Sequence, residues 1–135
     1  AAVAAKISDE VIVRRALPRG DLASAAAQAV VNDYESSGAM ILRLLAQEDR
    51  HPDLSKLLQV GRREHRRWVD QTFADALDRC DPESREALLD QLVALTDVYV
   101  WKLWRVDMKR PPQAVAARMA GLIRSALQQG GQHHG

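Results

Sequence analysis

The chain has 135 residues, of which 47% are hydrophobic and 4% aromatic, and its formal net charge is +1. This length predicts one domain with its own core, and the near-zero charge excludes an overall basic footprint for nucleic acid. The single cysteine, Cys80, excludes an intramolecular disulfide and is consistent with a cytoplasmic protein. Since no apolar run reaches membrane-spanning length, we expect no membrane partner.

The first half of the chain predicts two helices. Residues 2–17 place apolar side chains at helical spacing, and Pro18-Arg19-Gly20 ends this segment. Asp21 is a suitable N-cap for a second helix that ends by residues 49–52. Ser36-Ser37-Gly38 interrupts this second helix, so we expect a kink there.

The second half predicts three more helices. Asp53 can cap a third helix that runs to about Arg79. Asp81-Pro82 opens a fourth, which we expect to continue without interruption to about Val106. A last helix follows Arg110-Pro111-Pro112 and ends near residue 128. We therefore expect an all-α bundle of five to six helices over residues 1–129, with residues 130–135 as a flexible tail.

Residues 87–106 are more apolar than the surface of a small monomer allows. At 100° per residue, apolar side chains cover about half of the helix, more than the stripe usual for a core-facing helix. Val98 and Trp101 then fall on the remaining side, beside Ala94 and Arg105. We expect the broad arc through Leu92, Tyr99 and Leu103 to face the subunit's own core and the opposite side to face a second copy.

Signatures of catalysis and of cofactor binding are missing from the sequence. It has no glycine-rich phosphate loop, no paired-cysteine motif and no His-Glu-x-x-His pattern. We therefore expect no enzyme activity, no catalytic residues, no cofactor and no metal site.

His65 is the most informative polar residue, because it interrupts the apolar stripe of the third helix one turn after Gly61. One interpretation is close helix packing with His65 hydrogen-bonded in the core. The other is a cavity in which Gly61 removes bulk and His65 offers a polar group to a ligand. Tyr34, beside the interruption at residues 36–38, admits the same two interpretations.

Four arginines gather on the other face of the third helix: Arg62, Arg63, Arg66 and Arg67. Arginine clusters can neutralise phosphates, but Glu64 and Asp70 interleave with this one. The pattern favours a solvated face over a nucleic-acid interface, with Arg66 and Asp70 as an i,i+4 pair.

Three segments resemble the C-terminal regulatory domain of TetR-family transcriptional regulators: Tyr34–Pro52, Gly61–Val69, and Leu95–Trp104 followed by a helix that begins at proline. The resemblance covers about residues 3–127. The family's N-terminal helix-turn-helix domain is absent from this sequence, and residues 2–17 look like the helix that connects it to the regulatory domain.

The resemblance implies a homodimer, of a repressor type, in which the last two helices pair with their counterparts in a four-helix bundle. It also implies a cavity in each subunit for a small apolar or amphipathic effector, and binding to operator DNA only through the missing N-terminal domain. The alternative is a helical dimerisation or adaptor module without a ligand. We expect the cavity to be lined by Tyr34, Gly38, Ile41, Gly61, His65, Trp68, Thr96 and Tyr99. We expect the dimer interface to contain Ala94, Val98, Trp101, Arg105, Val115, Met119, Leu122 and Ile123.

Overall fold

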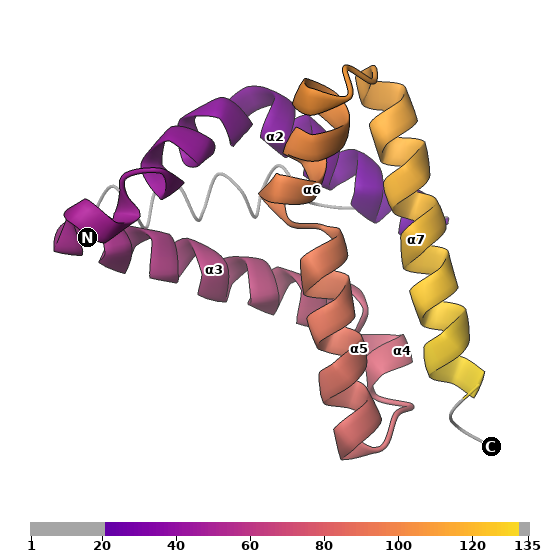
Figure 1. Ribbon diagram of the computed structural model, residues 1–135. Coiled ribbons are helices and arrows are strands. Elements are labelled where there is room, and N and C mark those ends of the chain that lie inside the picture. Colours follow the sequence, from indigo (N-terminus) through magenta and orange to yellow (C-terminus); the bar gives the residue numbers. More distant parts are fainter. Residues whose placement is uncertain (1–20, 133–135) are drawn as a thin grey trace.

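The computed structural model describes residues 21–132, with side chains as far as residue 130. The described part of the chain contains helices and no strand, which confirms the predicted all-α class (Figure 1). The helix expected over residues 2–17 and the end of the expected tail, residues 133–135, lie outside it. The elements are α2 (Leu22–Leu45), the 3-10 turn η1 (Glu48–Arg50), α3 (Pro52–Thr72), α4 (Ala74–Leu77), α5 (Pro82–Leu95), α6 (Val98–Lys102), the π-helical turn η2 (Leu103–Asp107) and α7 (Pro112–Gln132).

Local capping sets where these helices begin. The Asp21 side chain accepts a hydrogen bond from the backbone N–H of Ser24, and Asp81 does the same for Ser84, so both predicted caps are confirmed. The cap predicted at Asp53 is wrong. Proline occupies the first position of α3, where its missing N–H costs nothing, and His51 precedes it as the N-cap.

The core lies where the first half of α2 packs along α7, and α5 also packs against α7 (Figure 1). Alanines on α2 and α7 allow the two backbones to approach closely, and larger side chains from the other helices fill the remaining space. The hydrophobic residues with no measurable exposure are Ala26, Ala27, Val30, Val31, Val69, Leu77, Leu92, Val115, Met119 and Ile123.

Residues 36–38 lie inside one continuous helix, α2, which arches across the top of the molecule (Figure 1). The Ser37 hydroxyl donates to the carbonyl of Asp33 at 2.9 Å, a contact that favours helix bending. Gly38 is buried against the ring of Trp101 on α6, and a Cβ at this position would lie 2.6 Å from a ring carbon. Glycine is therefore required here by close packing rather than by a break in the helix.

The uninterrupted helix expected over residues 82–106 is wrong. α5 ends at Leu95, and Asp97 caps a new helix by accepting a hydrogen bond from the N–H of Tyr99 at 2.9 Å. A π-helical turn, η2, then widens the last part of the segment. Asp97 is a typical N-cap residue, but its apolar neighbours conceal this in the sequence.

These interruptions rotate the expected faces of the segment. Tyr99 and Leu103, expected in the subunit's core, are 55% and 46% exposed, whereas Val98 and Trp101, expected at a partner chain, are buried. A helical wheel drawn across a break and a π turn loses its register, since each changes the rotation per residue.

The last helix extends further than expected. α7 continues to Gln132, so the predicted start of a flexible tail at Gly130 is wrong. Gly130 lies against Leu88 of α5, and a Cβ there would be 2.9 Å from a methyl carbon of that leucine.

The Gly38–Trp101 contact gives a stability prediction. Gly38→Ala should lower the free energy of unfolding by about 1–3 kcal/mol, because the methyl group overlaps a buried ring. Gly121→Ala is the matched control, since nothing lies within 4 Å of where its Cβ would be. The control should be neutral or stabilising by up to about 1 kcal/mol, as alanine favours the helix. Urea denaturation measures both, and equal stability of the two variants would contradict the packing described.

Candidate functional site

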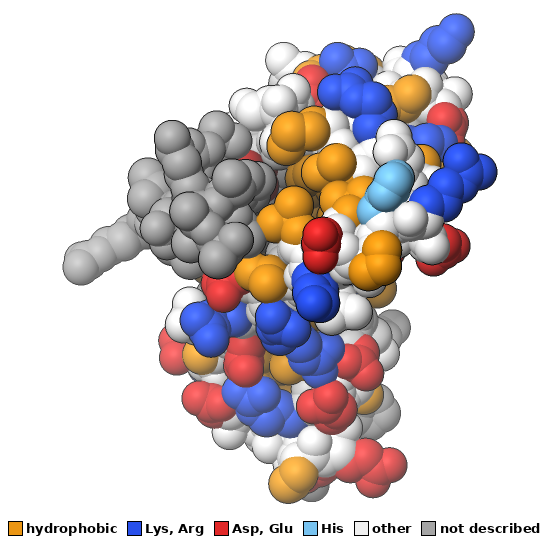
Figure 2. Space-filling view, turned by 90° about the vertical axis from the view of Figure 1, so that its left-hand side faces the viewer, with side chains coloured by type: hydrophobic (Ala, Val, Ile, Leu, Met, Phe, Trp, Pro, Cys, Tyr) orange, Lys and Arg blue, Asp and Glu red, His pale blue; other side chains and the backbone are white. Residues whose placement is uncertain are grey.

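A cavity of about 220 Å³ lies between the second half of α2, the first half of α3 and the junction of α5 with α6. Figure 2 shows hydrophobic side chains gathered in the upper half of one face, with Lys, Arg, Asp and Glu interspersed in the lower half. The cavity is lined by Asp33, Tyr34, Met40, Ile41, Leu44, Leu45, Leu57, Leu58, Val60, Gly61, Arg62, His65, Val93, Asp97, Val98 and Tyr99.

Thr96, at the end of α5, is the polar centre behind the cavity wall. Its backbone carbonyl accepts a hydrogen bond from the Tyr34 hydroxyl at 2.7 Å, which ties α2 to the junction. Its side-chain oxygen lies 2.9 Å from Nε2 of His65, which ties α3 to the same point. Thr96 is fully buried, so three helices meet at one satisfied polar residue.

The single hydrogen of the Thr96 hydroxyl determines which group donates in the hydrogen bond between His65 and Thr96. The Thr96 hydroxyl donates to the carbonyl of Leu92 at 2.8 Å, which uses its only hydrogen. Nε2 of His65 is therefore the donor to Thr96. The ring of His65 also stacks on Trp68, with centroids 6.2 Å apart and an interplanar angle of 20°. These two contacts fix the orientation of the imidazole at the cavity wall.

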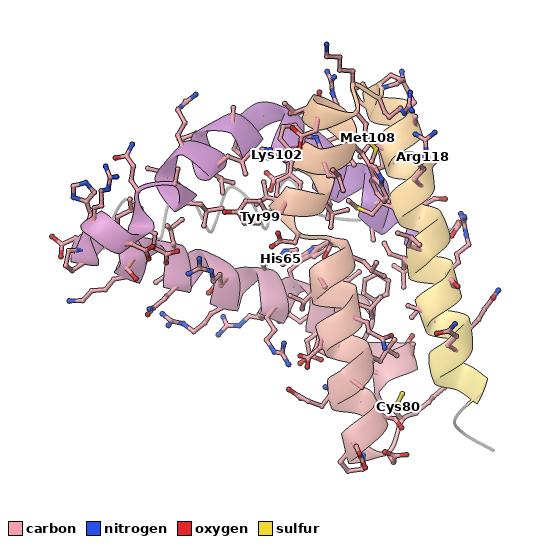
Figure 3. All side chains as sticks on the ribbon, in the orientation of Figure 1. His65, Cys80, Tyr99, Lys102, Met108 and Arg118 are labelled. Atoms are coloured by element: carbon pink, nitrogen blue, oxygen red, sulfur yellow. The ribbon has the colours of Figure 1, made fainter. Side chains whose placement is uncertain are left out.

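Five of the eight residues expected to bind a ligand line this cavity: Tyr34, Ile41, Gly61, His65 and Tyr99. Figure 3 shows the side chains of His65 and Tyr99 in the space between α3 and α6. His65 is hydrogen-bonded to the buried Thr96, and it also lines the cavity.

The other three expected residues lie outside the cavity lining. Gly38 is covered by Trp101, Trp68 is buried in the core behind His65, and Thr96 is buried at the junction. Trp68 and Thr96 lie one layer behind the lining and contact His65, which does line it, whereas Gly38 packs against Trp101 outside the lining. Helical spacing identified the inward faces, but it cannot separate the lining from the side chains that support it.

The sequence reasoning missed the charged part of the lining, which consists of Asp33, Arg62 and Asp97. Arg62 is turned toward η1, where its two terminal nitrogens donate to the two Glu48 carboxylate oxygens at 2.7 and 2.6 Å. The hydrogen bond from Arg62 holds the pKa of Glu48 below its usual value, and Glu48 in turn raises the pKa of Arg62. The fourteen-residue separation of this pair gives no signal in the sequence.

Arg66 and Arg67 of α3, like Arg62, are engaged in ion pairs. Arg66 bridges to α5 through Glu86 at 2.7 Å and Asp90 at 2.9 Å, and Arg67 lies 3.7 Å from Glu64. The i,i+4 pair expected between Arg66 and Asp70 is wrong, because Asp70 is bound by Arg85 of α5 at 2.7 Å. The charges on this face therefore join α3 to α5.

Most of the residues expected at a dimer interface lie within the core of the single chain. Of the eight, Ala94 and Leu122 are exposed, while Arg105 is half-buried and bound to Glu35 of α2. The interface set was wrong for the remaining five, because these side chains pack between α2, α6 and α7: Val98, Trp101, Val115, Met119 and Ile123.

Within residues 21–132, no three His, Cys, Asp or Glu side chains gather as metal ligands. No helix in that range is long and apolar enough to cross a membrane. Comparison of the chain with protein families, characterised proteins and solved structures gives no match.

Proposed function

We propose that this chain is the ligand-sensing and dimerisation domain of a cytoplasmic TetR-type transcriptional regulator, and that it binds a small apolar or amphipathic molecule. The observation that carries the proposal is the 220 Å³ cavity, which has an apolar lining and a few oriented polar groups. An apolar cavity of about 150 Å³ is large enough to hold benzene. The cavity in this chain therefore has room for a compact ring or a short alkyl chain.

The family assignment rests on the sequence resemblance. In such a regulator a helix-turn-helix domain binds operator DNA, and the effector modulates this DNA binding. A helical adaptor without a ligand is the second candidate. The cavity favours the sensor, because protein interiors are normally packed with few voids larger than a water molecule.

A route from the cavity to the surface supports a sensing role. Glu35 on α2 accepts hydrogen bonds from Nε1 of Trp101 at 2.8 Å and from Nε of Arg105 at 3.1 Å. Its neighbour Tyr34 lines the cavity. A ligand that moves α2 would therefore also move α6 and η2, because Glu35 joins them.

The surface that this route reaches is the better candidate for the dimer interface. η2 and the residue after it expose Leu103, Val106 and Met108 by 46%, 50% and 47%. Clustered exposed apolar side chains mark sites of protein association. This surface replaces the buried residues predicted from the sequence.

Ligand binding can be tested with 1-octanol, a neutral probe with an alkyl chain, by isothermal titration calorimetry. We expect saturable binding at one site per chain. Gly61→Leu should weaken binding at least tenfold, because nothing lies within 4 Å of a Cβ at residue 61 and the new side chain would occupy the cavity. Its stability should equal or exceed that of the parent, since leucine favours the helix. Absence of octanol binding would contradict the sensor proposal.

The dimer can be tested by light scattering at micromolar concentration. We expect twice the chain mass of 15.0 kDa for the parent and the mass of one chain for Val106→Glu, because a carboxylate cannot be buried in an apolar interface without a large cost. Leu22→Glu is the matched control, as Leu22 is 39% exposed at the start of α2. A monomeric parent, or a Val106→Glu variant that remains a dimer, would exclude this surface.

A further inference from the structure

We propose that the effector is an amphipathic amine, whose ammonium group binds Asp97 and whose alkyl or aryl part fills the apolar end of the cavity. This inference rests on the proposed function and adds the chemical class of the ligand. It follows from how polar and apolar groups are distributed along the cavity and from which of the charged groups are already paired.

Apart from Arg62, which is paired with Glu48 of η1, the polar groups of the lining gather at one end of the cavity and the apolar groups at the other. Leu44 and Leu57 line it near the turn that joins α2 to α3, where they are accompanied by Met40, Ile41, Leu45 and Leu58. Tyr34 lies ten residues before Leu44, or about 15 Å along α2 at 1.5 Å per residue. His65 lies about 12 Å from Leu57 along α3 by the same measure. Asp97 and Tyr99 come from the α5–α6 junction, on the side of Tyr34 and His65.

The described lining offers one cation to an anionic head group, and that cation is already paired. Arg62 is the one lysine or arginine among these residues, and both of its terminal nitrogens already bind Glu48. A ligand carboxylate would have to displace Glu48 or lie beside it as a like charge. Either outcome makes binding of an anion less favourable.

Asp97 offers acceptor capacity to a cation, and it also acts electrostatically on Arg62, whose pKa it helps to raise. One of its carboxylate oxygens accepts the N–H of Tyr99, and a carboxylate has about four acceptor positions in all. Tyr99, two residues further on, also lines the cavity, and aromatic rings attract ammonium groups. The second lining carboxyl group, Asp33, is 1% exposed and is engaged in a contact of its own.

The alkyl chain and the head group should contribute separately to affinity. The chain gains from leaving water whatever head group it carries, so octanol, octylamine and octanoate share this contribution. A charge-assisted hydrogen bond is roughly twice as strong as a neutral one. We therefore expect octylamine to bind about tenfold more tightly than octanol, and octanoate more weakly than either.

The test compares these three probes at pH 7 by isothermal titration calorimetry on the whole chain and on two variants. Asp97→Asn removes the charge but keeps a side chain that can cap α6. Asp90→Asn removes an equal charge from α5, where Asp90 is bound to Arg66 outside the cavity lining. The amine preference should disappear in Asp97→Asn and persist in Asp90→Asn, and Asp90→Asn should bind octanol with the affinity of the parent.

The outcomes separate the ligand class from the proposed function. If octanol binds but octylamine binds no more tightly, or if Asp97→Asn keeps the preference, the amine is excluded and the cavity remains a ligand site. If octanoate binds most tightly, Arg62 is the head-group partner and the proposal is wrong. If none of the three binds, both the amine and the sensing function are contradicted.

Discussion

The break between α5 and α6 at Thr96 is the constraint on which the rest of the structure depends. The backbone carbonyl of Thr96 accepts from Tyr34, and its side-chain oxygen is contacted by His65, so α2 and α3 are both fixed to this point. An unbroken helix would use that carbonyl in its own backbone hydrogen bonds. The interruption is therefore stabilised by tertiary contacts, and buried polar groups of this kind are costly to leave unpaired.

The break also separates two parts of the molecule with different packing. On one side, the first half of α2, α5 and α7 form a hydrophobic core rich in alanine. On the other side, α2 and α3 enclose the cavity, and their leucines line it without filling it. Gly38 and Trp101 hold α6 tightly against α2 at the boundary. Glu35 extends this contact to Arg105, so the cavity wall and the exposed apolar side chains of η2 belong to one connected unit.

Much of the fold was accessible from local sequence signals, whereas the layout of the site was not. Asp21 and Asp81 mark helix starts because capping is a local interaction, and the apolar spacing around Gly61 and His65 identifies an inward face. The break at Thr96–Asp97 could not be predicted, because the groups that stabilise it come from residues 62 and 31 positions earlier in the chain. Once that break and the π turn at Leu103 are missed, the faces assigned to Val98, Trp101 and Tyr99 are inverted.

The central claim is that the polar contacts of Thr96 shape the cavity, and the most direct measurement compares Thr96→Val with Thr96→Ser. Valine keeps the shape of the side chain but leaves Nε2 of His65 without its acceptor, whereas serine keeps the hydroxyl. We predict that Thr96→Val lowers the free energy of unfolding by about 1–3 kcal/mol and weakens octanol binding several-fold, and that Thr96→Ser retains binding. Unchanged stability and octanol affinity in Thr96→Val would contradict the account.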